Sequence, residues 1–188
     1  LTRLEEFETV NAQRVAVANK KLYVDRKNGF VGTSMRKEEF LFECSPYDEL
    51  VIFKKDCTMM VTKVEDKTFV GKGIELVEVF DRKDQRRVYN YVYQDGRDGK
   101  AMAKRFHIGG ITRNRDYDLS KGTKGTKLLY LSSNANGEAE VLAVHLKPRP
   151  RVKLNFNYDL GNIEVKGRGV NGVTLSKHPI KRLKLERI

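Results

Sequence analysis

The sequence predicts an all-β fold, a propeller-like array of about four blades, each a four-stranded repeat of 40–52 residues. Three observations support this prediction. The apolar runs are short and bounded by turn residues, and no segment between residues 15 and 188 has a convincing helical stripe. A loop of Gly and Lys or Arg also recurs before an apolar strand. Its copies, counted at Gly32, Gly73, Gly125 and Gly172, are 41, 52 and 47 residues apart.

The chain divides into a short acidic leader and one long domain. We expect residues 1–14 to form a linker into the domain, and residues 15–188 to form a single β domain with approximate blades at 15–48, 49–87, 88–146 and 147–188. Because the chain starts with Leu, we also expect it to be a fragment of a longer polypeptide.

Each strand prediction rests on a β-branched or aromatic run between turn signals. Asn28-Gly29 is typical of a tight hairpin turn, and residues 95–99 predict another turn. We interpret the alternating Tyr89, Tyr91 and Tyr93, like the Met59-Met60 pair, as packing between blades. The main expected strands cover 15–18, 21–25, 49–53, 58–64, 87–93, 101–106, 128–131, 138–146, 152–156 and 161–165.

Positive charge is concentrated in the second half of the chain. The net charge is +12, yet residues 1–99 hold 18 basic and 18 acidic side chains. Residues 100–127 hold eight basic and two acidic side chains, and residues 147–188 hold eleven and three. A basic surface of this size attracts an extended polyanion and gains free energy from counterion release. The charge distribution therefore favours nucleic acid as the partner over a merely solvated surface.

Other classes of function find little support. Cys44 and Cys57 lack metal-ligand spacing, so we expect buried free thiols in a reducing cytoplasm. His107, His145 and His178 have no partner residues at catalytic or metal spacing, and no phosphate-binding nucleotide motif is present. No signal peptide and no run of 18 apolar residues is present, so neither secretion nor a membrane span is supported.

The repeated loops resemble those of a known family. The stretches 121–128 and 167–175, and more loosely 66–74, are similar to the repeat in the C-terminal domain of bacterial type IIA topoisomerase A subunits, those of DNA gyrase and topoisomerase IV. The resemblance covers roughly residues 15–188. It implies a β-pinwheel, a propeller-like disc whose blades exchange strands, with a basic rim that bends and wraps duplex DNA.

The resemblance also carries expectations about the parent protein. It implies an ATP-dependent topoisomerase of the bacterial cytoplasm that works with a B subunit. The same resemblance implies that ATP and magnesium are used in other domains. We expect no catalytic residue, metal or cofactor in the present domain.

The sequence departs from the family pattern in two ways, which bear on the expected number of blades and on the expected activity. Family pinwheels usually have five or six blades, and this chain has room for about four. The Gln-Arg-Arg-Gly-Gly-Lys-Gly box of gyrase is absent, because Val88-Tyr89-Asn90, which we interpret as strand, follows Gln85-Arg86-Arg87. Relaxation and decatenation, as in topoisomerase IV, are therefore expected rather than negative supercoiling, and a diverged gyrase is left open.

Cations on glycine-bent loops are the candidate DNA contacts, because Lys and Arg neutralise phosphates and glycine allows close approach. The candidates are Lys121, Lys124, Lys127, Lys166, Arg168, Lys177 and Arg182, then Lys104, Arg105, Arg113 and Arg115, and last Lys72. Such contacts predict weak sequence preference and dependence on DNA shape. A protein-binding propeller and an RNA-binding β module are the alternatives.

Overall fold

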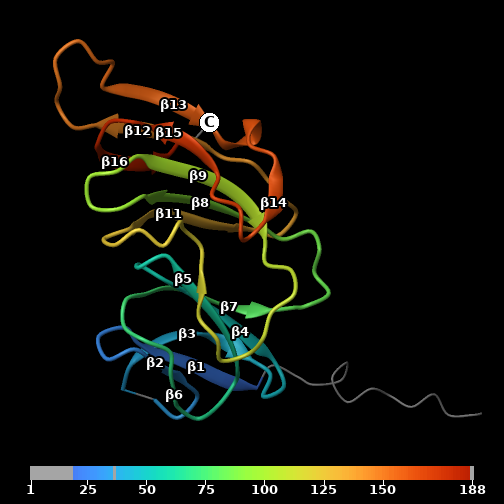
Figure 1. Ribbon diagram of the computed structural model, residues 1–188. Helices are drawn as coiled ribbons and strands as arrows, with labels where there is room; N and C mark the ends of the chain where they lie inside the picture. The colour runs from blue at the N-terminus through green and yellow to red at the C-terminus, as the bar shows by residue number, and fades with distance from the viewer. Residues whose placement is uncertain (1–18, 36, 187–188) are drawn as a thin grey trace, which may run out of the picture.

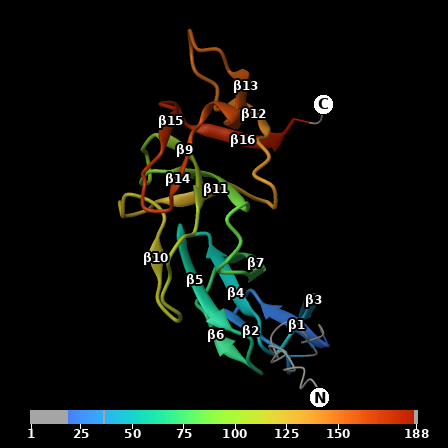
Figure 2. The ribbon, with the colours of Figure 1, turned by 90° about the vertical axis from the view of Figure 1, so that its right-hand side faces the viewer.

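A computed structural model describes residues 19–35 and 37–186 of the chain (Figure 1). These residues form sixteen β-strands and one 3-10 turn, η1 (Leu160–Asn162). The all-β prediction is therefore confirmed. The strands make four sheets that follow one another from the bottom to the top of Figure 1 and again in Figure 2.

The first two sheets have four strands each. The first has the order β3-β1-β2-β6 and contains β1 (Lys20–Asp25), β2 (Phe30–Gly32), β3 (Glu39–Cys44) and β6 (Thr68–Phe69). The second has the order β10-β5-β4-β7 and contains β4 (Glu49–Lys54), β5 (Thr58–Lys63), β7 (Ile74–Phe80) and β10 (Tyr117–Asp118).

The last two sheets differ in strand number. The third has five strands: β8 (Val88–Gln94), β9 (Ala101–His107), β11 (Lys127–Asn134), β14 (Val165–Gly167) and β15 (Val173–Ser176). The fourth has the order β13-β12-β16 and contains β12 (Val141–Leu146), β13 (Asn155–Asp159) and β16 (Ile180–Leu185).

A single rule relates the four sheets. Each is built on a hairpin, and in the first three sheets the unit that follows lends a strand to the second strand of that hairpin. Thus β6 pairs with β2, β10 pairs with β5, and β15 pairs with β9, each antiparallel. The lent strand comes from the chain just before the outer strand of its own unit. This is the strand exchange of a β-pinwheel, and it links neighbouring sheets through the backbone.

Side-chain alternation along the hairpin strands explains how the sheets pack. In β4, Leu50 and Ile52 point into a core with the first sheet, whereas Val51 and Phe53 point into a core with the third. In β8, the tyrosines face the second sheet, as expected for packing between blades. Val92 on the opposite face of β8 joins a core with the fourth sheet.

These packing contacts form three cores between four sheets, among the described residues. The first and fourth sheets lie at opposite ends of the molecule and share none of these cores (Figure 1). The array is therefore an open row of blades.

The main differences from the sequence prediction concern the last third of the chain. The strand expected at 152–156 runs from Asn155 to Asp159, and the one expected at 161–165 is η1 followed by β14. The expected blade 88–146 contributes to two sheets, because β12 belongs to the fourth. Because each of the first three sheets includes a strand from the next unit, the blades do not correspond to consecutive stretches of the sequence. The strand expected at 15–18 lies outside the described residues.

Candidate nucleic-acid interface

The hairpin turns of all four sheets lie on one edge of the row, at the left in Figure 1. The loops that follow the lent strands β6, β10 and β15 lie between them. We call this set of turns and loops the basic edge; it comprises residues 26–29, 54–57, 70–73, 95–100, 119–127, 147–153 and 177–179.

Backbone contacts join the members of the basic edge into one surface. Val70 N–H donates to the carbonyl of Gly29 over 2.9 Å, and Lys55 N–H donates to that of Gly73 over 2.8 Å. Leu128 N–H then donates to the carbonyl of Lys55 over 2.9 Å. The turns of the first three sheets are thereby connected.

Further contacts continue the edge through the last two sheets. Gly96 N–H donates to Thr126 Oγ1 over 2.9 Å. Ala101 and Ser176 are register partners, and Lys147 N–H donates to the carbonyl of Pro179 over 2.9 Å. The edge therefore crosses all four sheets without a break.

The charge of this edge is strongly positive. Its seven segments contain fifteen Lys and Arg residues, three Asp residues and no Glu. Lys54 is buried and paired with Asp116 at 2.7 Å, so its charge is not presented to solvent. Arg26 is paired with Glu39 at 2.8 Å, and two lysines form longer surface pairs, Lys121 with Asp95 at 3.6 Å and Lys55 with Glu75 at 3.8 Å. Such exposed pairs are weak and leave the ammonium groups available to phosphates.

Glycine is required at several turns of the edge. Gly71, Gly73, Gly122 and Gly125 all have φ between +75° and +95°, a region that residues with side chains rarely adopt. A Cβ at Gly29 would lie 2.5 Å from the backbone of Gly71. The glycines therefore let neighbouring turns pack closely while the lysines between them point to solvent.

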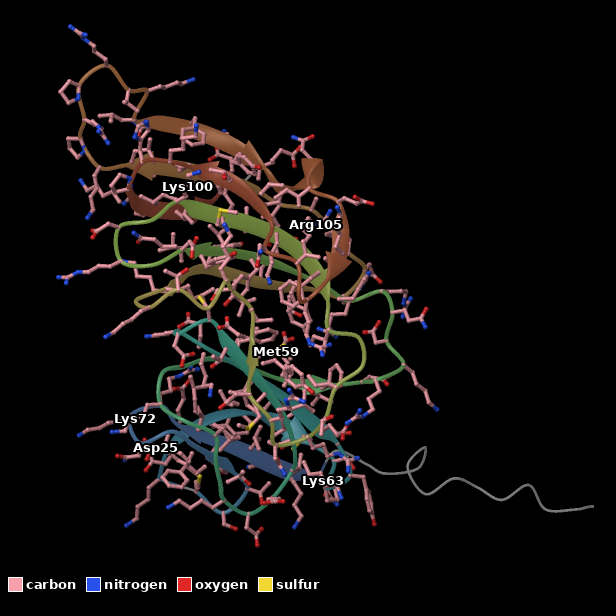
Figure 3. The ribbon with its side chains drawn as sticks, in the orientation of Figure 1. Asp25, Met59, Lys63, Lys72, Lys100 and Arg105 are labelled. Atoms are coloured by element: carbon pink, nitrogen blue, oxygen red, sulfur yellow. The ribbon has the colours of Figure 1, made fainter. Side chains whose placement is uncertain are left out.

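Five of the predicted contacts lie on the basic edge, and all five are exposed. They are Lys72, Lys121, Lys124, Lys127 and Lys177. In Figure 3, Lys72 and Lys100 lie toward the left of the molecule, whereas Lys63 and Arg105 lie toward the right. The structure thus brings together lysines that are more than one hundred positions apart in the sequence.

Two of the predicted contacts, Lys104 and Arg105, are buried and hydrogen-bonded within the protein. The Lys104 ammonium donates to the carbonyls of Arg168 and Val170 at 2.8 and 3.1 Å and lies over the Phe106 ring at 4.9 Å. Burial lowers the pKa of Lys104 to about 8. Arg105 donates from Nε to Asn90 and from Nη2 to the carbonyl of Gly137. Both cations therefore form hydrogen bonds within the third sheet and its loops.

Lys166 and Arg168 lie away from the basic edge. Strand β14 runs parallel to β9, so Gly167 is the register partner of His107 at the far end of that strand. Arg168 donates from Nη1 to the carbonyl of Ile108, and its guanidinium lies 4.5 Å from the Tyr117 ring centre. Lys166 is exposed and lies 3.2 Å from Glu164.

The last copy of the sequence repeat, at Gly172, is therefore not equivalent to the copies at Gly73 and Gly125. The loops at 70–73 and 119–127 follow lent antiparallel strands, and the corresponding turn in the last unit follows β15 at Lys177-His178-Pro179. The glycine loop at 167–172 instead follows the extra strand β14 and leads into β15.

The remaining predicted residues are exposed but occupy other surfaces. Arg113 forms an ion pair with Glu49, which Arg82 also binds at 2.6 Å. Hydrogen bonding from Arg82, and then from Arg113, lowers the pKa of Glu49. Arg115 lies 5.4 Å from the Tyr117 ring, and Arg182 projects from β16 beside His145.

Several exposed cations of the edge are absent from the sequence prediction. They are Lys27, Lys55, Arg97, Lys100, Lys147, Arg149, Arg151 and Lys153. A signal for them exists, because the 95–99 turn and the Pro/basic connector 147–150 are recognisable as turns or connections. Nothing in the sequence shows that these turns share one edge with the glycine loops.

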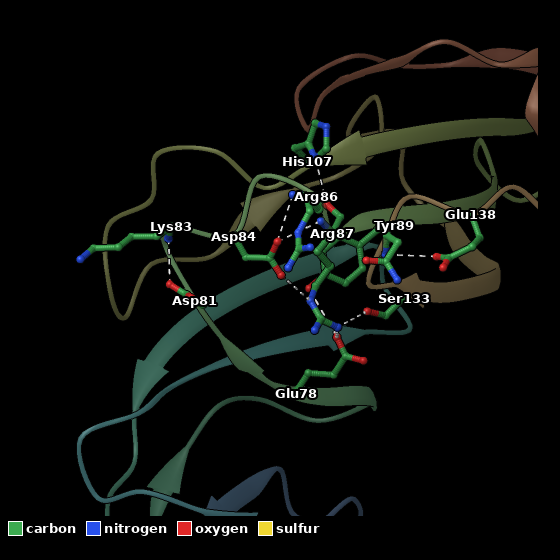
Figure 4. A network of polar contacts seen from close by, with 11 residues as sticks. Glu78, Asp81, Lys83, Asp84, Arg86, Arg87, Tyr89, His107, Ser133 and Glu138 are labelled. Atoms are coloured by element: carbon green, nitrogen blue, oxygen red, sulfur yellow. Dashed lines mark hydrogen bonds and ion pairs between the residues drawn. The ribbon is translucent and has the colours of Figure 1, made fainter. Parts of the chain in front are cut away.

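The opposite end of β8 carries a polar network (Figure 4). Arg87 donates from Nη1 to Ser133 at 2.9 Å and lies within 3.6 Å of Glu78 and 3.4 Å of Asp84. His107 Nδ1 lies 2.8 Å from the carbonyl of Arg87. Strand β8 begins one residue later, as interpreted from the sequence. Arg87 therefore holds β7, β8 and β11 together.

Among the described residues, we also considered reactive thiols, metal-binding clusters and membrane-spanning helices. Cys44 and Cys57 are buried free thiols, and burial raises the pKa of each to about 11. No group of three His, Cys, Asp or Glu side chains that could hold a metal ion occurs in the described part of the chain. Within the same residues, no helix is long and apolar enough to span a membrane.

Comparison with known proteins agrees with this architecture. The chain is 24% identical over 186 residues to the A subunit of DNA topoisomerase 4 from Borreliella burgdorferi, a match that covers 98% of this chain and 28% of that protein. The chain thus spans less than a third of the relative. The sequence profile of the family described as topoisomerase C-terminal domain, Bacteroidota, matches residues 21–187. With four strand-exchanged sheets and a profile match over most of its length, the chain belongs to this family of topoisomerase C-terminal domains.

Proposed function

We propose that this domain binds duplex DNA along the basic edge and bends it, without strong preference for sequence. The observation that carries the proposal is the continuity of that edge across four sheets, with fifteen basic and three acidic residues. Phosphates of one DNA segment can meet successive turns along the row.

Physical chemistry supports binding of this kind. Lysine and arginine neutralise phosphates, and exposed backbone N–H groups of bent loops can add hydrogen bonds. Neither group distinguishes base pairs. Bending 20–30 base pairs costs on the order of 1–6 kcal/mol, so contacts at several turns are needed to offset it.

We also propose a parent enzyme for the domain. It is the A subunit of an ATP-dependent type IIA topoisomerase that works with a B subunit in the bacterial cytoplasm, using ATP and magnesium held elsewhere. The domain presents DNA for relaxation and decatenation rather than for negative supercoiling. Two observations support this choice: the similarity to a DNA topoisomerase 4 and the absence of the gyrase box.

A charge-neutralising variant tests the DNA interface. Lys121, Lys124 and Lys127 replaced together by Ala should weaken binding to unrelated duplexes by a similar factor. The slope of log K against log salt should decrease by up to about 0.9 for each lost phosphate contact. Fluorescence anisotropy at several salt concentrations measures both quantities.

The matched control removes the same charge elsewhere. Lys63, Lys83 and Arg86 are exposed and lie off the basic edge, and their replacement by Ala also lowers the net charge by three. This control should retain nearly the full salt slope. Equal slopes for the two triple variants would place the interface on another surface, and preference for structured RNA over duplex DNA would favour the RNA-binding alternative.

A further inference from the structure

The strand-exchange rule leaves one position empty. In the first three sheets, the second strand of the hairpin pairs with a strand lent by the next unit, through β6, β10 or β15. In the fourth sheet the corresponding strand, β13, pairs only with β12 among the described residues. Figure 1 shows β13 as the outermost strand at that end of the row.

The backbone of β13 is ready to pair on its free side. Leu146 N–H donates to the carbonyl of Leu154, and Leu160 N–H donates to that of Glu140. Even-numbered residues of this strand therefore face β12. In an antiparallel strand, alternate residues direct their N–H and C=O groups to opposite edges. The odd-numbered residues consequently present theirs to the open edge, and all three are exposed: Asn155, Asn157 and Asp159.

Nothing in the described part of the chain is built to fill this position. The lent strands come from connections of ten, nineteen and twenty residues between the second hairpin strand and the outer strand. The corresponding connection of the first unit, between β2 and β3, has only six residues. It is too short to cross to another sheet and return, so the first unit has no strand to lend.

Residues 1–18 are the longest part of the chain outside the described fold. They end in Val15-Ala16-Val17-Ala18, where alternating β-branched residues favour a strand. This segment directly precedes Asn19 and β1 in the sequence. Strand β1 belongs to the first sheet, at the end of the row opposite β13.

The same copy cannot supply this strand in the open row. Stacked sheets lie about 10 Å apart, so the first and fourth sheets are separated by about 30 Å. Four extended residues span at most about 14 Å. A second copy has no such restriction.

We propose that residues 15–18 of a second copy of this chain pair antiparallel with β13 and complete the fourth sheet. Reciprocal exchange between two copies closes a symmetric dimer, in which each partner lends one strand. Because both copies carry a net charge of +12, their repulsion opposes association. Dimerisation should therefore strengthen with added salt, opposite to the salt dependence of DNA binding.

Substitutions on both strands test the proposal by sedimentation equilibrium of the 188-residue chain. Asn157→Pro removes the N–H that faces the open edge, whereas Asn157→Ala keeps it. Val15→Asp with Val17→Asp alters only the lent segment and leaves the described fold untouched. We expect a dimer for the parent chain and for Asn157→Ala, and at least about tenfold weaker association for the other two variants.

Disulfide formation between two cysteine variants tests whether residues 15–18 of a second copy occupy the open edge of β13. A protein carrying only Ala16→Cys is mixed with a protein carrying only Asn157→Cys under mild oxidation, and a mixed disulfide dimer is expected. The native thiols Cys44 and Cys57 are buried, at 1% and 0% exposure. Asn134→Cys, at the end of β11, replaces Asn157→Cys as the control. A monomeric parent chain, a dimer that survives Val15→Asp with Val17→Asp, or equal pairing with the control would overturn the proposal.

Discussion

Lys104 and Lys124 carry the same ammonium group in different surroundings. Lys124 is exposed on the basic edge, whereas Lys104 is 3% exposed and donates to two carbonyls of the loop that follows β14. Burial is the main cause that lowers the pKa of Lys104 to about 8, and nearby Cys57 and Asp118 partly oppose it. A lysine in this position organises a loop and has no free charge for a phosphate.

The pKa of Lys104 predicts a specific pH dependence of stability. Lysine titrates near 10.4 in an unfolded chain, so between about pH 8 and 10.4 the unfolded state binds more protons and this group favours folding as pH rises. The difference in unfolding free energy between wild type and Lys104→Met should increase over this range, by at most about 1.4 kcal/mol per pH unit. Urea unfolding at about pH 7, 8, 9 and 10 measures it, and a constant difference would show that Lys104 keeps an ordinary pKa.

At the scale of elements, the segment 165–176 differs from the other glycine loops because it adds a parallel strand. A Cβ added at Gly167 or Gly169 would meet no atom within 4 Å, and neither residue has the positive φ of the edge glycines. Gly172 has φ +87°, and a Cβ there would lie 2.4 Å from the carbonyl oxygen of Ala103. Glycine is therefore required where the loop turns back into β15, but not in its middle.

Alanine substitutions distinguish these two kinds of glycine. Gly172→Ala should destabilise the domain by about 1–3 kcal/mol or more, because it combines a strained φ with a backbone clash. Gly169→Ala should change stability by less than about 0.5 kcal/mol. Thermal unfolding of both variants makes the comparison, and similar melting temperatures would contradict the tight approach to β9.

At the scale of the whole molecule, the open row and its basic edge predict an effect on DNA topology. A segment wrapped out of plane along successive turns of the row constrains writhe, and writhe that persists through ligation alters the linking number. Relaxed plasmid closed by ligase with the isolated domain should show a linking-number change that grows with the protein-to-plasmid ratio. The Lys121, Lys124 and Lys127 triple variant should reduce this change, and an unchanged distribution at saturating protein would exclude stable wrapping.

The local parts of the fold were largely predictable. The Asn28-Gly29 turn, the buried run at β4 and the alternating tyrosines of β8 follow from turn chemistry and a period of two. The candidate interface was predictable in part. The sequence pattern singled out lysines beside positive-φ glycines, whereas the grouping of the charged hairpin turns on one edge and the position of segment 167–172 away from that edge depend on the tertiary structure.

The fold class, the positions of most turns and the surplus of positive charge can be derived from the sequence, because they depend on residue types and short-range spacing. The folded chain is needed to show which strand each unit lends, which cations share the basic edge, and that Lys104 and Arg105 are buried. Strand partners and burial arise from contacts between distant residues, such as Lys55 with Gly73 and Leu128. A local pattern therefore cannot distinguish a lysine on the edge from one beneath a loop.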